Sequence, residues 1–451
     1  MNRKIWIDVK WCQYLVPAVS GLLFYCFLYF HSETTFANLQ LPVGQYKNNI
    51  WFHSDYLTYY RPAKNFLETG VFGNGTNPDP LRTVGYPAFL ALLIKLFKNN
   101  WIYYAYFLHC IIIPIIYPLI YSITEKLINR KTARISLIIS LFSGLYFGRM
   151  IFIGTDLVFM VFFLAAILFL IKYFENQRKA TFLILYFITI LISSLIRPSL
   201  MYYYPAHLMM VFFLDKKYKV FVSKSKLWKF SILTTILVWA IVNISSYRNY
   251  MNYGFFKPTI VLNANYINHV SRDILRKEGK NEIFDSLYRQ QYRIEDYTDR
   301  MKWQNETVIR IIEKYPFSFI KVIISNIKNT LFDNGLINPV GNYFNYNWRE
   351  EEGLKYSAFM HITFLIYAVG YIILYILAAF GIYRIIRKQD WILLLLIFYL
   401  LSIFLLPPFI FGSGGSRLRI PVEWIIVILG CVTIVSILDR IKLYNKRIKP
   451  I

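Results

Sequence analysis

The chain has 451 residues, of which 57% are hydrophobic, 19% aromatic and only 17% charged. A water-soluble domain of this length would expose more charge, so the composition indicates an integral membrane protein. Lys and Arg outnumber Asp and Glu by 50 to 25, but they gather in short clusters between apolar runs. This pattern is typical of cytoplasmic membrane loops, and we expect no nucleic-acid partner. The four cysteines lie in or beside apolar segments without metal-ligand spacing.

The N-terminus begins with a short basic segment that contains Arg3, Lys4 and Lys10. The apolar run that follows, 11–30, is long enough to span a bilayer, which takes roughly 20 residues. Since no small-x-small cleavage site follows it, we predict an uncleaved first span with a cytoplasmic N-terminus.

A polar loop, 31–101, comes next. Its stretch from Trp51 to Ala91 holds Asp55, a turn region rich in Gly and Asn, and then Arg82. The run from Gly85 to Phe97 is apolar but too short to span, so we predict a helix lying at the outer surface. Arg82 would then precede a helix N-terminus, where backbone N–H groups also favour an anion. An acid and a cation flanking one turn suggest a site where a hydroxyl is activated near a phosphate.

Nine further apolar runs have spanning length: 102–124, 135–153, 156–174, 181–196, 199–214, 228–246, 358–383, 391–411 and 420–438. Lys and Arg cluster in alternate connections, which by the positive-inside rule face the cytoplasm. Ten spans with both termini in the cytoplasm follow. The outer connections are 31–101, 150–155, 197–198, 247–357 and 412–419.

The fold class is therefore all-α integral membrane, with about ten transmembrane helices and helices at the outer surface. We divide the chain into a catalytic transmembrane module (1–246, with the first outer loop 31–101), an extracytoplasmic cap (247–357) and a C-terminal transmembrane module (358–451). Apolar residues at helical spacing between Asn268 and Lys314 predict that the cap is mostly helical.

Ionisable residues beside spans are costly in hydrocarbon and therefore point to function. On the outer face these are Asp55, Asp156, Arg197 and the pair Arg417 and Arg419, which Arg82 and Lys257 would join. Each has a simpler interpretation. Asp55 could be a solvated loop residue, Asp156 a helix N-cap, and the arginines of the spans interfacial anchors. Asp79, Asp333 and the run from Glu350 to Glu352 are expected to be solvated.

Six motifs carry a resemblance to a known family. In chain order they are Asp55 in HSDYLTYYRPAKNFLETG, then LRTVGYPAFLALL, Thr155-Asp156, Arg197-Pro198, Tyr247-Arg248-Asn249-Tyr250 with Gly254-Phe255-Phe256-Lys257-Pro258, and Arg417-Leu418-Arg419-Ile420-Pro421. The chain resembles GT-C type glycosyltransferases, the lipid-phosphosugar-dependent membrane enzymes that include protein mannosyltransferases and the aminoarabinose transferase. Val84 stands where the family usually has proline. Tyr56 follows Asp55 where protein mannosyltransferases have a second acid, which counts against a protein acceptor.

The resemblance implies an inverting transfer from a polyprenyl-phosphate sugar, with Asp55 as the base that deprotonates an acceptor hydroxyl. One carboxylate suffices, because phosphate leaves readily without an acid. Asp156 would orient the acceptor, hold an arginine or help to bind a divalent ion. The implied phosphate-binding residues are Arg82, Arg197, Lys257, Arg417 and Arg419, and the implied substrate-binding residues are His53, Tyr56, Tyr59 and Tyr86. Metal use varies in the family, so Mg²⁺ or Mn²⁺ stays open as a cofactor.

We therefore predict a bacterial inner-membrane glycosyltransferase with an extracytoplasmic active site, an undecaprenyl-phosphate-type donor, and a cell-envelope glycan or glycolipid acceptor. One alternative is a ligase or polymerase of lipid-linked glycans, whose key arginines usually lie in a large late outer loop. Another is a transporter or flippase of lipid-linked sugars, but the span interiors here are nearly free of charge and show no repeat.

Overall fold

The computed structural model describes residues 56–142, 146, 154–176, 178–332, 358–411 and 416–448, together with the isolated positions 19 and 23. The predicted first span at 11–30 lies outside the described residues except for those two positions. Asp55 and His53 lie outside them too, as do Asp333 and the run from Glu350 to Glu352. The described chain is almost entirely helical, which confirms the all-α prediction.

The elements form three groups, and the cap falls between the long helices α11 and α19 in the chain. The first outer loop forms α3 (Tyr56–Thr69), β1 (Gly73–Asn74), β2 (Asn77–Pro78) and α4 (Gly85–Phe97). The long helices are α5 (Trp101–Leu127), α6 (Arg130–Phe142), α8 (Thr155–Glu175), α9 (Ala180–Ile196), α10 (Tyr204–Tyr218), α11 (Lys224–Val242), α19 (Ala358–Arg387), α20 (Trp391–Phe411) and α21 (Ile420–Ile448). The cap holds α12 (Ile244–Tyr253), α13 (Val261–Asn265), η4 (Tyr266–Ser271), α14 (Arg272–Lys277), α15 (Asn281–Gln291), α16 (Tyr297–Lys314) and α17 (Pro316–Phe332).

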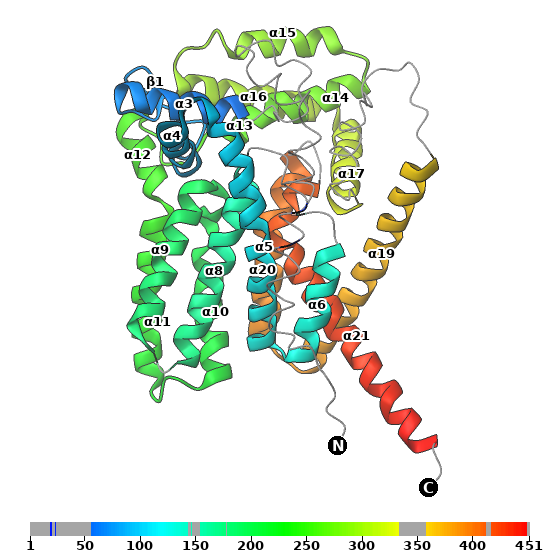
Figure 1. Ribbon diagram of the computed structural model, residues 1–451. Helices are drawn as coiled ribbons and strands as arrows, with labels where there is room; N and C mark the ends of the chain where they lie inside the picture. Colours follow the sequence, from blue (N-terminus) through cyan, green and yellow to red (C-terminus); the bar gives the residue numbers. More distant parts are fainter. Residues whose placement is uncertain are drawn as a thin grey trace.

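The long helices run side by side, and α3, α4 and the cap helices α13 to α16 lie across one end of them (Figure 1). Among the described residues, six helical stretches are long and apolar enough to cross a membrane, and Ala180–Ile196 is a shorter apolar helix. Several such helices in one chain make it a multi-pass membrane protein. The count of ten spans stays a prediction.

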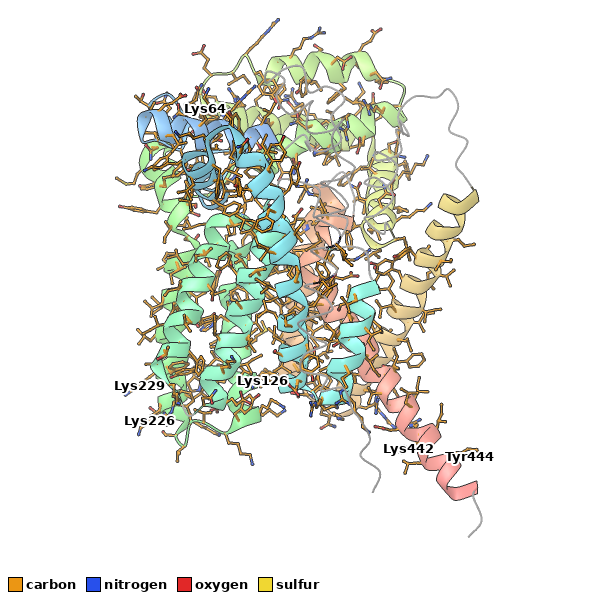
Figure 2. All side chains as sticks on the ribbon, viewed as in Figure 1. Lys64, Lys126, Lys226, Lys229, Lys442 and Tyr444 are labelled. Atoms are coloured by element: carbon orange, nitrogen blue, oxygen red, sulfur yellow. The ribbon has the colours of Figure 1, made fainter. Side chains whose placement is uncertain are left out.

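Basic side chains mark the end of the bundle that lies away from the cap. Lys126, Lys226, Lys229 and Lys442 all lie there (Figure 2). Their separation from the cap agrees with the alternating pattern of basic connections in the sequence. The assignment of that end to the cytoplasm stays a prediction.

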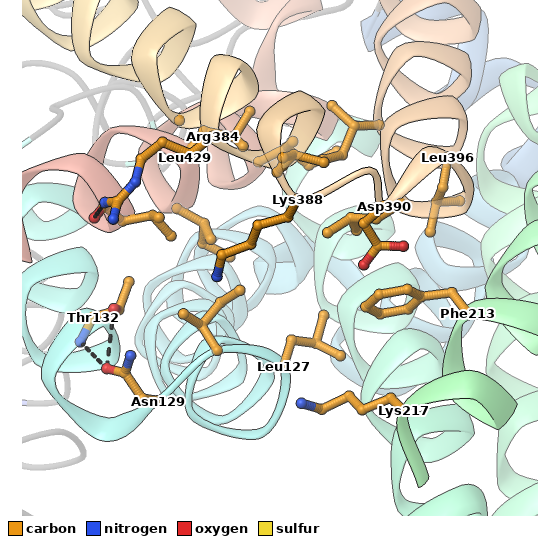
Figure 3. Close-up of a pocket in the computed structure, with 18 of the residues that line it drawn as sticks. Leu127, Asn129, Thr132, Phe213, Lys217, Arg384, Lys388, Asp390, Leu396 and Leu429 are labelled. Atoms are coloured by element: carbon orange, nitrogen blue, oxygen red, sulfur yellow. Dashed lines mark hydrogen bonds between the residues drawn. The ribbon is translucent and has the colours of Figure 1, made fainter. Parts of the chain in front are cut away.

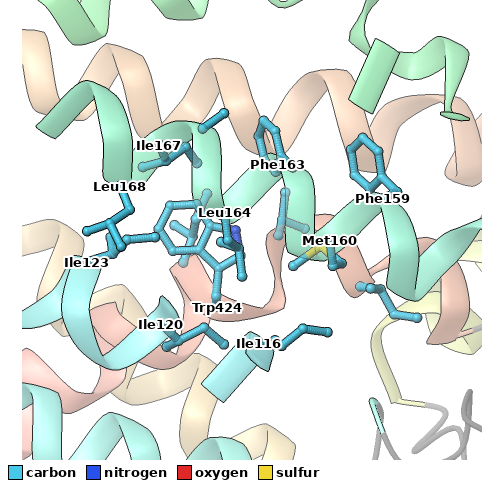
Figure 4. Packing of buried hydrophobic residues seen from close by; sticks show 14 of the residues in the cluster. Ile116, Ile120, Ile123, Phe159, Met160, Phe163, Leu164, Ile167, Leu168 and Trp424 are labelled. Carbon is cyan, nitrogen blue, oxygen red and sulfur yellow. The ribbon is translucent and has the colours of Figure 1, made fainter. Parts of the chain in front are cut away.

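The interior is built around α8 and α21, the two candidate spans with the largest buried share. Helix α8 and residues 424–438 of α21 are apolar around their whole circumference, as expected of helices enclosed by others. Leu164 of α8 lies beside Trp424 of α21, whereas Phe159 and Phe163 face Phe404 of α20, with ring centroids 6.2 and 5.7 Å apart (Figure 4). In contrast, α11 and α19 expose most of their apolar side chains, which suits helices that face lipid.

The first outer loop contains a hairpin and is joined to the cap by a backbone hydrogen bond. Asn65 of α3 holds the hairpin, since its amide donates to the Val71 and Gly75 carbonyls at 2.8 and 2.9 Å. Gly73 is required there, because a Cβ would lie 1.8 Å from the Asn77 oxygen. Beyond the hairpin, the Ile260 N–H donates to the Pro80 carbonyl at 3.1 Å. The loop and the cap therefore form one unit above the bundle.

Candidate active site

Asp156 lies in the first turn of α8, at the end of the bundle that carries the cap. Gly154, in extended conformation, precedes the helix, and no side chain caps it. The Asp156 carboxylate instead accepts from Arg197 Nη1 at 3.0 Å and lies 3.9 Å from Arg417 Nε. The side chain is 11% exposed. The N-cap interpretation is therefore wrong, and Asp156 is an anchor for two arginines.

Pro198 explains the position of Arg197. A proline disfavours helical conformation in the residue before it, and Arg197 is extended, with φ −133° and ψ 119°. Helix α9 thus ends at Ile196, and the Arg197 side chain turns toward α8. Its guanidinium lies 5.5 Å from the centre of the Phe159 ring and reaches the Asp156 carboxylate.

Two guanidinium groups share one carboxylate here. Arg417 comes from η5 (Ser416–Leu418), far along the chain from Arg197. The side chains of Arg197 and Arg417 are 14% and 25% exposed. Partly buried arginines bind phosphate oxygens well, because the planar fork donates two parallel hydrogen bonds. We call Asp156, Arg197 and Arg417 the arginine cluster.

A third arginine approaches the cluster from the first outer loop. Arg82 donates to the Thr58 hydroxyl at 2.9 Å and to the Tyr59 hydroxyl at 3.2 Å. Tyr59 packs edge-on against Tyr86, with ring centroids 5.1 Å apart. Two tyrosines therefore position Arg82 just before the start of α4.

The start of α4 packs against the end of α9, and this contact fixes the position of the segment 82–86. A Cβ on Gly85 would lie 2.5 Å from the Leu195 carbonyl, so only glycine allows the contact. The buried Thr83 hydroxyl donates to the Ile196 carbonyl at 3.2 Å. The segment between Arg82 and Tyr86 is thereby joined to the residue directly before Arg197.

Arg419 occupies a different environment from Arg417. Its side chain is fully buried and donates to Glu423 at 2.6 Å and to the Thr330 carbonyl at 2.8 Å. Its guanidinium also lies 4.2 Å from the centre of the Tyr371 ring. These contacts join α21 to α17 and α19. Glu423 was not singled out from the sequence, although its spacing of four residues from Arg419 is the signal of a helical ion pair.

The remaining predicted residues are spread over the outer loop and the cap. Lys257 is exposed, and its carbonyl accepts from Asn249 at 2.8 Å. Tyr59 and Tyr86 are buried, while nothing is described for the Tyr56 side chain. His53 and Asp55 lie outside the described residues. The structure thus brings together Asp156, Arg197 and Arg417, with Arg82, Tyr59 and Tyr86 beside them.

Asp79 was expected to be solvated, and this expectation is wrong. Its carboxylate is partly buried and accepts from the Leu81 N–H at 2.7 Å. Burial raises its pKa above the usual value, although Leu81, Arg82 and Arg248 oppose the shift. Arg248 donates to the Asp79 carbonyl at 2.8 Å. A carboxylate therefore lies beside Arg82 where the sequence suggested only a turn.

No group of three or more His, Cys, Asp or Glu side chains within the described ranges could hold a metal ion. In the arginine cluster, the single carboxylate already faces two cations, which is an unfavourable set of ligands for Mg²⁺ or Mn²⁺. The described residues therefore fit an anion better than a divalent cation.

Comparison with known proteins gives a match over the same region. Residues 82–245 match the sequence profile of the family described as dolichyl-phosphate-mannose-protein mannosyltransferase. This range contains Arg82, Asp156 and Arg197. No curated protein matches the chain.

Two solved structures from Archaeoglobus fulgidus are similar over 98% of this chain. They are the archaeal oligosaccharyltransferase AglB in complex with an inhibitory peptide and a dolichol-phosphate (TM-score 0.49, 13% identity) and an oligosaccharyltransferase in the apo form (TM-score 0.49, 14% identity). The similarity covers 52% of each of those chains, so this chain spans about half their length. The profile match over residues 82–245 supports the resemblance to GT-C type glycosyltransferases.

Proposed function

We propose that this chain transfers a sugar from a polyprenyl-phosphate donor to a hydroxyl of a cell-envelope glycan or glycolipid. The reaction takes place on the extracytoplasmic face of a bacterial inner membrane, with inversion at the anomeric carbon. The observation that carries the proposal is the arginine cluster, in which two partly buried guanidinium groups meet at the boundary between apolar helices and a polar cap. A lipid-linked phosphate presents its tail to the former and its sugar to the latter.

In the proposed reaction, the acceptor oxygen forms a bond to the anomeric carbon as the bond to the phosphate oxygen breaks. The acceptor proton passes to Asp55, and polyprenyl phosphate leaves with the electron pair. Asp55 directly precedes Tyr56, the first residue of α3, and α3 also contributes Thr58 and Tyr59, which contact Arg82. This short separation in sequence supports a base near the phosphate-binding arginines.

We assign the leaving phosphate to Arg197 and Arg417, with Arg82 at its edge. Donors positioned where charge develops lower the barrier, because they need no reorganisation during the reaction. Asp156 is a positioning residue in this proposal. Of the three roles open to it, holding the arginines agrees best with its contacts at 3.0 and 3.9 Å.

Arg419 and Lys257 are not among the residues that we assign to the leaving phosphate. The buried Arg419 guanidinium already donates to Glu423 and to carbonyl groups of α17, so we assign it to the packing of the bundle. Lys257 is exposed on the cap, where it could meet the sugar or the acceptor. The substrate contacts proposed for His53, Tyr56, Tyr59 and Tyr86 follow from their places in or beside α3 and α4.

The test uses the purified full chain and a panel of synthetic polyprenyl-phosphate sugars, with release of polyprenyl phosphate as the readout. We expect release from one donor, and a rate lower by about 10²-fold or more in Asp55→Asn, as for loss of a general base. Asp285→Asn is the matched control, because Asp285 is exposed on α15. Release that persists in Asp55→Asn would remove Asp55 from the mechanism. Binding of donor without release, with acceptor present, would favour transport.

A further inference from the structure

A cavity of about 740 Å³ lies between the long helices, toward the end of the bundle that is away from the cap. Its walls come from α5, α8, α10, α19, α20 and α21, and most of the side chains that line it are apolar. Ile171, Leu396 and Leu429 are examples from three of these helices. The volume is in the range of sites that hold one organic ligand, on the order of 300–1,000 Å³.

Basic side chains line the end of this cavity that lies away from the cap, which we call its rim. Four of them, Lys217, Arg384, Lys388 and Arg440, line it and form no ion pair with any described residue. In the close-up, Lys217 and Lys388 both extend into the space beside Leu127 (Figure 3). A cavity with apolar walls and a cationic rim is complementary to a molecule with an apolar chain and an anionic head.

The two acids at the rim are already paired. Asp390 accepts from Lys216 at 3.0 Å, and Asp439 accepts from Lys131 at 2.9 Å. The other four cations that line the cavity therefore have no acidic partner among the described residues and can bind an anionic ligand. The Arg384 guanidinium is held along the wall by a hydrogen bond of 3.3 Å to the Val432 carbonyl.

This cavity is separate from the arginine cluster. Asp156 of the cluster and Ile171, which lines the cavity, are fifteen positions apart on α8. At a rise of 1.5 Å per residue, they are about 22 Å apart along the helix axis. An anionic head at the rim therefore cannot reach the site near Asp156.

We propose that this cavity binds one anionic phospholipid, with an acyl chain between the helices and the phosphate at the four cations. Basic pockets between transmembrane helices on the cytoplasmic side are suited to anionic head groups, because that leaflet is negatively charged. The lipid fills the space between α19, α20 and α21 and joins them to α10. The inference stands apart from the proposed transfer reaction.

The test is native mass spectrometry of the full chain, exchanged into phosphatidylglycerol or phosphatidylcholine. We expect wild type to retain one phosphatidylglycerol in preference to phosphatidylcholine. Lys217→Gln/Lys388→Gln should lower that retention on the order of tenfold. Val432→Phe, which fills the cavity without a change of charge, should lower it as well.

The matched control is Lys226→Gln/Lys229→Gln, which removes two exposed cations at the same end of the molecule but outside the cavity. Its retention should equal that of wild type, and all variants should keep the wild-type melting temperature in detergent without added phospholipid. Equal losses in the control, or unchanged retention in Val432→Phe, would overturn the proposal, because the lipid would then lie on the surface. Displacement by an equal amount of polyprenyl phosphate would overturn the assignment to a phospholipid.

Discussion

Arg417 and Arg419 are two positions apart, but their surroundings give them different roles. Arg417 is partly exposed and faces Asp156 at 3.9 Å. Arg419 is fully buried against Glu423 at 2.6 Å and reaches the end of α17. The first can exchange its partner for a ligand, whereas the second cannot leave its partners without a large loss of stability.

Substitution of each arginine by glutamine tests this difference. Arg417→Gln should lower the transfer rate about 10²-fold, as for loss of one positioned donor, with little change in melting temperature. Arg419→Gln should lower the free energy of unfolding by about 3–5 kcal/mol, because Glu423 would be left buried and unpaired. Rates and thermal denaturation in detergent measure both effects. Similar melting temperatures for the two variants would contradict the structural role of Arg419.

Asp156→Asn tests the positioning role. The neutral amide keeps the size of the side chain but removes the charge that holds Arg197 and Arg417. We expect a transfer rate at least about tenfold lower and weaker donor binding, since removal of one partner of a charge pair disorders the other. Asp273→Asn, at an ion pair of 2.9 Å in the cap, is the matched control and should keep the wild-type rate. An unchanged KM for the donor in Asp156→Asn would refute the role.

Asp79 predicts a dependence of stability on pH. Burial raises its folded-state pKa above 3.8, so its contribution to stability is present below that pH and is lost as pH rises through the folded-state value. Asp79→Asn keeps an acceptor for the Leu81 N–H without the charge. The melting temperature of the variant relative to wild type should therefore rise between pH 4 and pH 7. A constant difference over this range would show that Asp79 does not titrate in it.

Helix packing at the site depends on the contact between α4 and α9. Gly85→Ala would place a methyl group 2.5 Å from the Leu195 carbonyl and would push the two helices apart. We expect a loss of about 1–3 kcal/mol in the free energy of unfolding, as for overpacking, and a lower transfer rate as Arg197 moves. Gly370→Ala on α19 meets no atom within 4 Å and should be neutral or slightly stabilising. Equal stability of the two variants would disprove the close contact.

The arrangement of the molecule in the membrane can be tested by chemical labelling. In a background without native cysteines, Lys229→Cys and Asp285→Cys place thiols at exposed positions at the two ends of the molecule. With a membrane-impermeant maleimide, Asp285→Cys should react in intact cells, whereas Lys229→Cys should react only after lysis. The reverse pattern would invert the predicted topology.

The sequence by itself determined the helical membrane fold, the alternation of basic connections and the ionisable residues that are candidates for the site. These follow from the amino-acid composition and from the spacing of apolar and basic residues. The fold is helical because a backbone in lipid must satisfy its hydrogen bonds within helices. It also predicted the residues of the arginine cluster. The tertiary structure decided which of them meet: Arg417 faces Asp156 while Arg419, two residues later, packs against Glu423. It also decided that Asp79 is partly buried and that a cavity with a basic rim lies far from the cluster. Contacts between residues distant in sequence depend on how helices dock, and no local pattern records that.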